Sequence, residues 1–119
     1  MIRSYRELVV WQKAMDLLVD VYRDTRCFPS EERYGLTSQM RRAAVSIPSN
    51  IAEGQMRLTT GEFRQFLGNA RGSLGELSTQ IEASRRLGFL EPDKAGCLVL
   101  PCDEIGRMIN GLLTSLRQR

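Results

Sequence analysis

The stretch that decides the fold is residues 60–87, TGEFRQFLGNARGSLGELSTQIEASRRL. Its apolar side chains return every three or four residues without a break, which is the spacing of one buried helix face. A helix of this length extends for about 40 Å at about 1.5 Å per residue. Thr60 is suited to begin it and Gly88 to end it. The positions on this face are Phe63, Phe66, Leu67, Ala70, Leu74, Leu77, Ile81, Ser84 and Leu87.

Three further segments repeat the pattern, and Ser4 with Glu7 forms a capping box that predicts where the first one begins. We predict helices over about residues 4–27, 36–56, 60–87 and 92–117. No segment alternates with a period of two, so no strand is expected. Four long amphipathic segments joined by short links predict one all-α domain over residues 1–119. Its expected architecture is an antiparallel, up-down-up-down four-helix bundle.

Two surfaces exceed what one bundle core needs. The first predicted helix has two adjacent apolar stripes, one of Leu8, Trp11, Met15, Leu18 and Tyr22, the other of Val10, Ala14, Leu17 and Val21. The third has glycines at positions 68, 72 and 75, opposite its apolar face. Either a second subunit packs on these surfaces, or the extra stripe covers a large aromatic side chain and the glycines face solvent.

Pro48 lies inside the second predicted helix, in AAVSIPSNIAEG over residues 43–54. A proline there costs about 3 kcal/mol or more. We expect it to bend the helix, with Ser and Asn side chains or water bonding the freed carbonyl of Ala44. In the fourth helix, Pro101 marks either a kink or a restart.

Polar side chains flank the apolar face of this second helix. Glu53 and Arg57 are spaced for an ion pair four residues apart. We interpret the flank as a structural polar stripe, with a subunit junction or an RNA recognition site as the alternatives. Its members are Gln39, Arg42, Ser46, Pro48, Ser49, Asn50, Glu53 and Arg57.

The composition argues against catalysis. Histidine is absent, which removes the commonest general base, the serine triad and most zinc sites. No phosphate-binding glycine loop and no set of nucleophile, base and orienting group is visible. We therefore predict a protein that is not an enzyme, with no cofactor and no metal. Cys27, Cys97 and Cys102 are interpreted as small buried thiols.

No apolar run approaches the roughly 20 residues that span a bilayer, and no signal peptide is recognised. These observations predict a cytoplasmic protein with neither a membrane nor a small molecule as partner.

The basic residues are unusual in kind. Net charge is only +3, but of the 17 basic residues only Lys13 and Lys94 are lysines. Arginine binds phosphate through two parallel hydrogen bonds, although a GC-rich genome would produce the same excess. The candidates for contact with nucleic acid are Arg41, Arg42, Arg57, Arg64, Arg71, Arg85 and Arg86, each of which can equally be a solvated helix face. Base stacking is not expected, because Trp11 and the phenylalanines lie on core stripes.

Three segments carry a family resemblance: LVVWQKAMDLLVDVY, FPSEERYGLTSQMRRAAVSIPSNIAEG and EFRQFLGNARGSLGELSTQIEASRRLGFL. They cover most of the chain. They resemble the bacterial four-helix bundle proteins first noted as open reading frames within intervening sequences of 23S ribosomal RNA genes. The resemblance implies a ring-like homo-oligomer, since relatives form pentamers. It extends to the accessory variability proteins of diversity-generating retroelements, whose basic pentameric barrels associate with RNA and a reverse transcriptase.

Two functional hypotheses follow. In the first, the homo-oligomer binds RNA or another nucleic acid through its arginine-rich surface. In the second, it is a scaffold for a protein partner and binds no nucleic acid.

Overall fold

The computed structural model describes residues 3–117, so the first two and last two residues of the predicted domain lie outside it. The described chain is helical and contains no strand, which confirms the all-α class. It forms a bundle of 46 × 22 × 20 Å. The helices are α1 (Val9–Asp24), α2 (Leu36–Met56), α3 (Thr60–Arg86) and α4 (Pro92–Arg117), with short 3₁₀ helices η1 (Tyr5–Glu7) and η2 (Ser30–Glu32).

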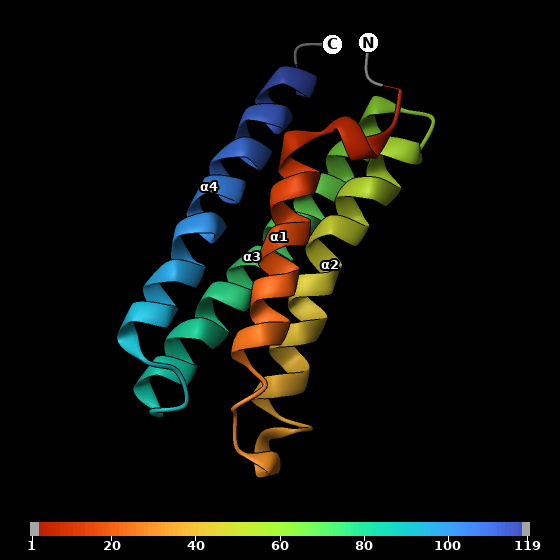
Figure 1. The fold of residues 1–119 in the computed structure, drawn as a ribbon. Coiled ribbons are helices and arrows are strands. Elements are labelled where there is room, and N and C mark those ends of the chain that lie inside the picture. Colours follow the sequence, from red (N-terminus) through yellow and green to blue (C-terminus); the bar gives the residue numbers. More distant parts are fainter. Residues whose placement is uncertain (1–2, 118–119) are drawn as a thin grey trace.

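Successive helices run in opposite directions and pack side by side, and α4 closes the bundle against α1 (Figure 1). Contacts between side chains give the same direction. The Ser84 hydroxyl of α3 donates to Met40 near the start of α2, at 3.3 Å. Farther along α2, Ser46 shares a hydrogen bond of 2.8 Å with Ser73. Residue numbers rise along one helix as they fall along the other, so α2 and α3 are antiparallel.

One of the two apolar stripes of α1 faces the core. Val10, Ala14, Leu17 and Val21 are at most 2% exposed. Most of the other stripe lies at the edge of the bundle, where Trp11, Met15 and Leu18 are half-buried. Beside it, Val19 is 58% exposed. Trp11 and Leu18 pack partly against the core and keep the rest of their surface exposed, so the outer side of α1 is apolar at Val19 and at the edges of these side chains. None of the described helices combines the length and apolarity needed to cross a membrane.

The first helix is shorter than the predicted range of 4–27. Ser4 caps only η1, by accepting a hydrogen bond from the Arg6 N–H at 3.1 Å. Leu8 then takes an extended conformation with ψ of 121°, and α1 begins at Val9. This break lets the Leu8 side chain turn inward, where it is 8% exposed. The capping pattern at Ser4 therefore starts only the short helix η1, and α1 starts later because the Leu8 side chain is buried.

The third helix is capped by Thr59 rather than by Thr60. The Thr59 hydroxyl accepts a hydrogen bond from the Glu62 N–H at 3.1 Å. At the other end Gly88 has φ of +82°, the left-handed conformation that glycine adopts after a helix.

Both α2 and α4 continue through their internal prolines, so Pro101 does not restart a helix. The Asn50 amide donates to the Ser46 carbonyl at 2.8 Å and to the Ser46 hydroxyl at 2.9 Å. The expected side-chain repair therefore acts on Ser46 rather than on the Ala44 carbonyl that Pro48 frees. The same Ser46 hydroxyl bonds Ser73, so Asn50 also supports the junction of α2 with α3.

This network predicts that replacing Asn50 by alanine lowers the free energy of unfolding by about 1 kcal/mol. Urea unfolding followed by circular dichroism measures the change. Ser49→Ala is the matched control, because Ser49 is exposed and its truncation should be close to neutral. Unchanged stability of N50A together with loss of a binding partner would instead assign Asn50 to ligand contact.

The three cysteines differ in exposure. The prediction that all three are buried thiols is wrong for two of them. Cys27 and Cys97 are exposed, and only Cys102 is buried. Burial raises the pKa of the Cys102 thiol to about 11, a shift that the nearby Asp103 carboxylate reinforces and a hydrogen bond with Ser78 opposes.

At about pH 8 we expect a thiol reagent to modify Cys27 and Cys97 quickly in the native protein, since thiolate is the reactive form. Cys102 should react only after unfolding. Counting released chromophore with and without denaturant checks this, and fast native reaction of all three thiols would contradict the packing of α3 against α4.

Candidate nucleic-acid interface

Some of the arginines predicted to contact nucleic acid instead bond other groups of the same protomer. Arg57 pairs with Glu53 at 2.8 Å, as their spacing predicts, and its guanidinium lies 4.8 Å from the centre of the Phe66 ring. Arg64 crosses from α3 to α4 and donates to the backbone carbonyl of Leu113. These two side chains stabilise the end of the bundle where α2 turns into α3.

Arg85 and Arg86 share one carboxylate at the end of α3. Glu82 accepts from Arg85 at 2.6 Å and from Arg86 at 2.9 Å. Hydrogen bonds from these two guanidinium groups lower the pKa of Glu82 to about 2. The carboxylate therefore stays ionised at all ordinary pH values and offsets part of their charge.

Arg41 ties the start of α2 to the end of α1. Its Nε donates to the Thr25 hydroxyl at 2.9 Å, its Nη2 donates to the Tyr22 carbonyl at 3.3 Å, and its guanidinium lies 4.6 Å from the centre of the Tyr22 ring. These partners are uncharged, so they hold the side chain in place without neutralising it. A guanidinium has five N–H donors, and two are used here, which leaves donors for a ligand.

Three arginines line one hollow of about 460 Å³ beside this junction. We call it the arginine pocket; its lining is Tyr22, Arg33, Tyr34, Thr37, Ser38, Arg41, Arg42 and Val45. Within residues 3–117, no carboxylate lies within 4.0 Å of the guanidinium nitrogens of Arg33, Arg41 or Arg42. The pocket therefore gathers three positive charges without a paired counter-charge.

The chain between α1 and α2 builds this pocket. Thr25 ends α1 by bonding back to the Val21 carbonyl at 2.8 Å, and Phe28 is buried against Phe89 with ring centres 5.8 Å apart. Glu32 then accepts a hydrogen bond from the Leu36 N–H at 3.1 Å, which turns its carboxylate to the first turn of α2. That geometry leaves Arg33 and Tyr34 pointing outward between the two helices.

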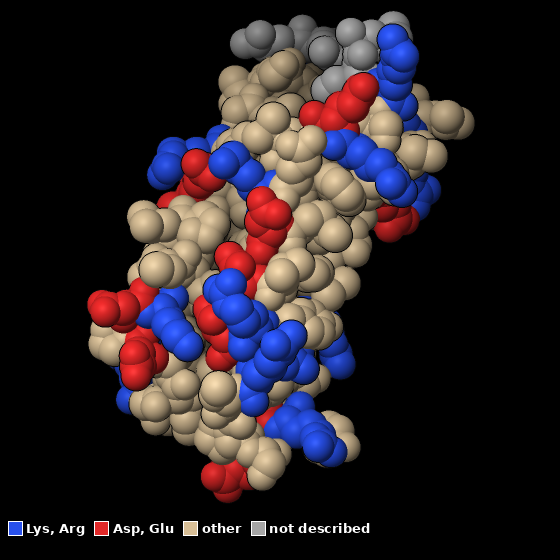
Figure 2. Space-filling view, in the orientation of Figure 1, with Lys and Arg blue, Asp and Glu red and all other residues tan. Residues whose placement is uncertain are grey.

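Charged side chains of both signs lie near the junction of α1 and α2. Figure 2 shows Lys and Arg side chains crowded where α1 ends and α2 begins, with carboxylates among them. Near the end of α1, Asp20 and Asp24 both pair with Arg23, at 3.1 Å each. These two carboxylates therefore form ion pairs with Arg23 and not with the arginines of the pocket.

Arg71, the remaining candidate, lies elsewhere. It lines a separate groove of about 370 Å³ between α3 and α4, together with Arg107 and Asp103. The structure therefore does not bring the seven predicted arginines together. Arg41 and Arg42 share the arginine pocket, Arg85 and Arg86 share Glu82, and the other three lie elsewhere.

The predicted polar stripe on α2 is also divided. Ser46 and Asn50 are joined by hydrogen bonds, and Pro48 is buried. Gln39, Arg42, Ser49 and Glu53 are exposed, and of these only Arg42 lines the arginine pocket.

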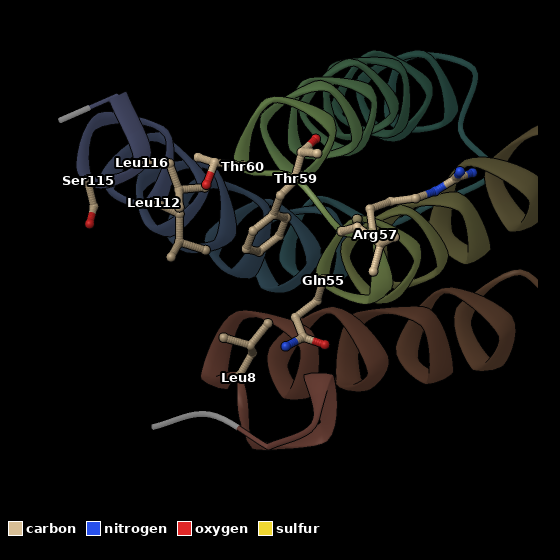
Figure 3. A pocket seen from close by; sticks show the side chains of 11 residues that line it. Leu8, Gln55, Arg57, Thr59, Thr60, Leu112, Ser115 and Leu116 are labelled. Carbon is tan, nitrogen blue, oxygen red and sulfur yellow. The ribbon is translucent and has the colours of Figure 1, made fainter. Parts of the chain in front are cut away.

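A further cavity, of about 580 Å³, lies at the opposite end of the bundle. Figure 3 shows Leu8, just before α1, and Leu112 of α4 projecting toward it, while Arg57 turns its guanidinium away. Its remaining lining includes threonine and serine hydroxyls and Leu116. Because no charged group points into it, this cavity is suited to an apolar side chain rather than to phosphate.

The family model described as 23S rRNA-intervening sequence protein matches residues 6–111. The chain belongs to the 23S rRNA-intervening sequence protein family. No curated protein matches it.

A solved member of the S23 ribosomal protein family supports the same fold for this 23S rRNA-intervening sequence protein. The structure is of a protein of unknown function from Bacteroides thetaiotaomicron, with a TM-score of 0.80 and 18% sequence identity. The alignment covers 88% of this chain and 98% of that one. At this identity the likeness establishes the shared four-helix fold and no activity.

Sequence reasoning missed two residues of the pocket in this family member, Arg33 and Tyr34. Both lie in the connector before α2, which has no helical period to mark a face. The expectation of a core position covered Trp11 and the phenylalanines and not the tyrosines; Phe28 is buried, whereas Tyr34 is 86% exposed. The available signal was composition: an arginine next to a tyrosine in a short polar connector.

Proposed function

We propose that this 23S rRNA-intervening sequence protein is a non-enzymatic, homo-oligomeric RNA-binding protein that holds the RNA backbone in its arginine pocket. The observation that carries the proposal is the set of three guanidinium groups, from Arg33, Arg41 and Arg42, lining one hollow without a paired carboxylate. Like charges gathered in this way repel one another, and an anionic ligand relieves the repulsion.

The number of charges favours a polyanion over a small anion. One phosphate is satisfied by one or two guanidinium groups, whereas the pocket presents three. The start of α2 adds the positive end of a helix dipole, with Thr37 and Ser38 lining the same hollow. A nucleic-acid strand carries successive phosphates, so a single ligand of this class can contact more than one of the three guanidinium groups.

Titration of a short, fluorescently labelled single-stranded RNA at about 50 mM and about 200 mM salt tests this proposal. Three phosphate contacts on a single strand give a slope of about −2 for log affinity against log salt, so affinity should fall roughly 20-fold between the two conditions. No binding at either salt concentration would remove the proposal.

We further propose that copies of the chain assemble, as a pentamer by analogy with the resemblance above. Supporting observations are the half-buried Trp11, Met15 and Leu18 with exposed Val19 on α1, and the open glycine face of α3. Added Cβ atoms at Gly68, Gly72 and Gly75 would meet nothing within 4 Å. Within the protomer nothing packs there, so this face has room for a helix of another copy. Sedimentation as a monomer at micromolar concentration would contradict assembly.

A scaffold without nucleic acid remains the second candidate, because one turn of the chain exposes unusual apolar surface. Leu58, which lines the cavity of about 580 Å³, is 98% exposed, and Met56, two residues before it, is 68% exposed. Affinity capture from the native host, with and without nuclease, distinguishes the two functions. Partners that survive nuclease favour the scaffold, and partners lost with the RNA favour RNA binding.

A further inference from the structure

The side chain of Tyr34 has no packing role in the described protomer. Its exposed fraction is 86%, whereas several other aromatic side chains contact a second ring or a guanidinium group. Tyr5 and Trp11 meet edge to face with ring centres 5.2 Å apart, and the Tyr22 ring lies under Arg41. A large ring held in water at this position loses the burial that normally stabilises an aromatic side chain.

We propose that Tyr34 is a stacking platform for an unpaired base, so that the arginine pocket takes single-stranded rather than duplex RNA. This inference rests on the proposed function and adds the class of RNA. Stacking of a base on an aromatic side chain contributes roughly 1–3 kcal/mol and occurs with every base, because each has a π-face.

The position of Tyr34 supports this assignment. It follows Arg33 directly and lines the same hollow as Arg42, so a nucleotide can place its phosphate against a guanidinium and its base against the ring. The hydroxyl groups of Thr37 and Ser38 lie in the same lining, where they can bond a ribose 2′-hydroxyl or a base edge.

The exposure of Tyr34 favours an unpaired base over a duplex. The ring is 86% exposed beside an open hollow of about 460 Å³, so a base that has left its stack can lie on it. Bases inside a duplex are stacked on one another and cannot reach Tyr34, so a duplex would use the arginines alone.

A contact between copies of the chain is the competing use of Tyr34, because tyrosine and arginine are also common at protein interfaces. A symmetric contact of this pocket with its own copy would set the guanidinium groups of Arg33, Arg41 and Arg42 against one another. That repulsion favours an anionic partner over a second pocket.

The test uses the full-length protein with single-stranded RNA that carries 2-aminopurine, and a duplex of the same sequence. We expect quenching of 2-aminopurine by the wild-type protein on the single strand. Tyr34→Ala should lower single-strand affinity roughly tenfold and abolish the quenching, while Tyr34→Phe stays within about twofold of wild type. Duplex affinity and the salt slope should not change, because the arginines remain.

The outcomes separate this inference from the proposed function. No binding of any RNA by the wild-type protein would overturn both. Salt-dependent binding that is equal for Tyr34→Ala and wild type, on single strand and duplex alike, would overturn the stacking role alone. Loss of self-assembly in Tyr34→Ala with unchanged RNA affinity per protomer would assign the ring to an interface between copies and would also overturn it.

Discussion

Replacing Gly54 by alanine lowers the stability of the bundle by about 2 kcal/mol, the largest effect that we expect from adding a single methyl group. A Cβ at this position would lie 2.7 Å from the Cβ of Phe66, 3.0 Å from Cδ1 of Phe63 and 3.3 Å from the Phe63 carbonyl oxygen. Two of these atoms belong to or adjoin the backbone of α3 and cannot move unless the helix moves. The cost of separating α2 from α3 there exceeds the roughly 1 kcal/mol by which alanine is the better helix former.

Gly68→Ala on α3 is the matched control, and we expect the opposite sign. An added Cβ there meets nothing within 4 Å, so only helix propensity acts and stability rises by about 0.5–1 kcal/mol. Urea unfolding of both variants gives the comparison. Equal effects of the two substitutions would contradict the close approach of α2 to α3 at Gly54.

The same glycine variants examine assembly. If another copy packs on the glycine face of α3, Gly68→Ala should weaken association even as it stabilises the protomer. Analytical ultracentrifugation over a dilution series separates these effects. Unchanged association would place the subunit contact on another surface, such as the outer face of α1.

Replacing Arg33 and Arg42 together by glutamine should cause the largest loss of RNA binding. Each phosphate contact on a single strand releases about 0.7 counterion, so the loss grows as salt falls. Extrapolated from 1 M salt, two lost contacts reduce affinity roughly 60-fold at 50 mM and roughly tenfold at 200 mM. A short RNA that occupies one pocket keeps multivalent binding from masking the change. Arg41 is left intact because it also ties α1 to α2.

Arg85→Gln with Arg86→Gln provides the charge-matched control. The two substitutions remove the same charge at the same end of the bundle, where Ser84 contacts Met40. Both side chains already bond Glu82, and they do not line the arginine pocket. We expect less than about a threefold change, since only the long-range field is altered. Equal losses in both double variants would show that net charge, rather than the pocket, sets affinity.

The helices could be predicted from sequence because their apolar period is regular over several turns. The residues of α3 show this best: the 3-4 rhythm from Phe63 to Ile81 has no competing interpretation. The start of α1 could not be predicted, because Ser4 and Glu7 form a locally valid cap. The break at Leu8 depends on what lies beneath that residue in the folded bundle.

The candidate site could be predicted only in part for a related reason. A pair such as Glu53 and Arg57 is set by spacing along one helix, and sequence suffices to predict it. The partner of Arg64 lies 49 residues away and that of Arg41 lies 16 away, so their occupation depends on tertiary packing. Sequence therefore made the arginines candidates but could not show which of them lack a paired charge.

The most direct test of the central claim compares the salt dependence of RNA binding between the wild-type protein and the Arg33→Gln, Arg42→Gln double variant. The slope of log affinity against log salt should become less negative by about 1.4, because two phosphate contacts disappear from the pocket. An identical slope for both proteins would contradict the claim that the unpaired arginines of this pocket hold the RNA backbone.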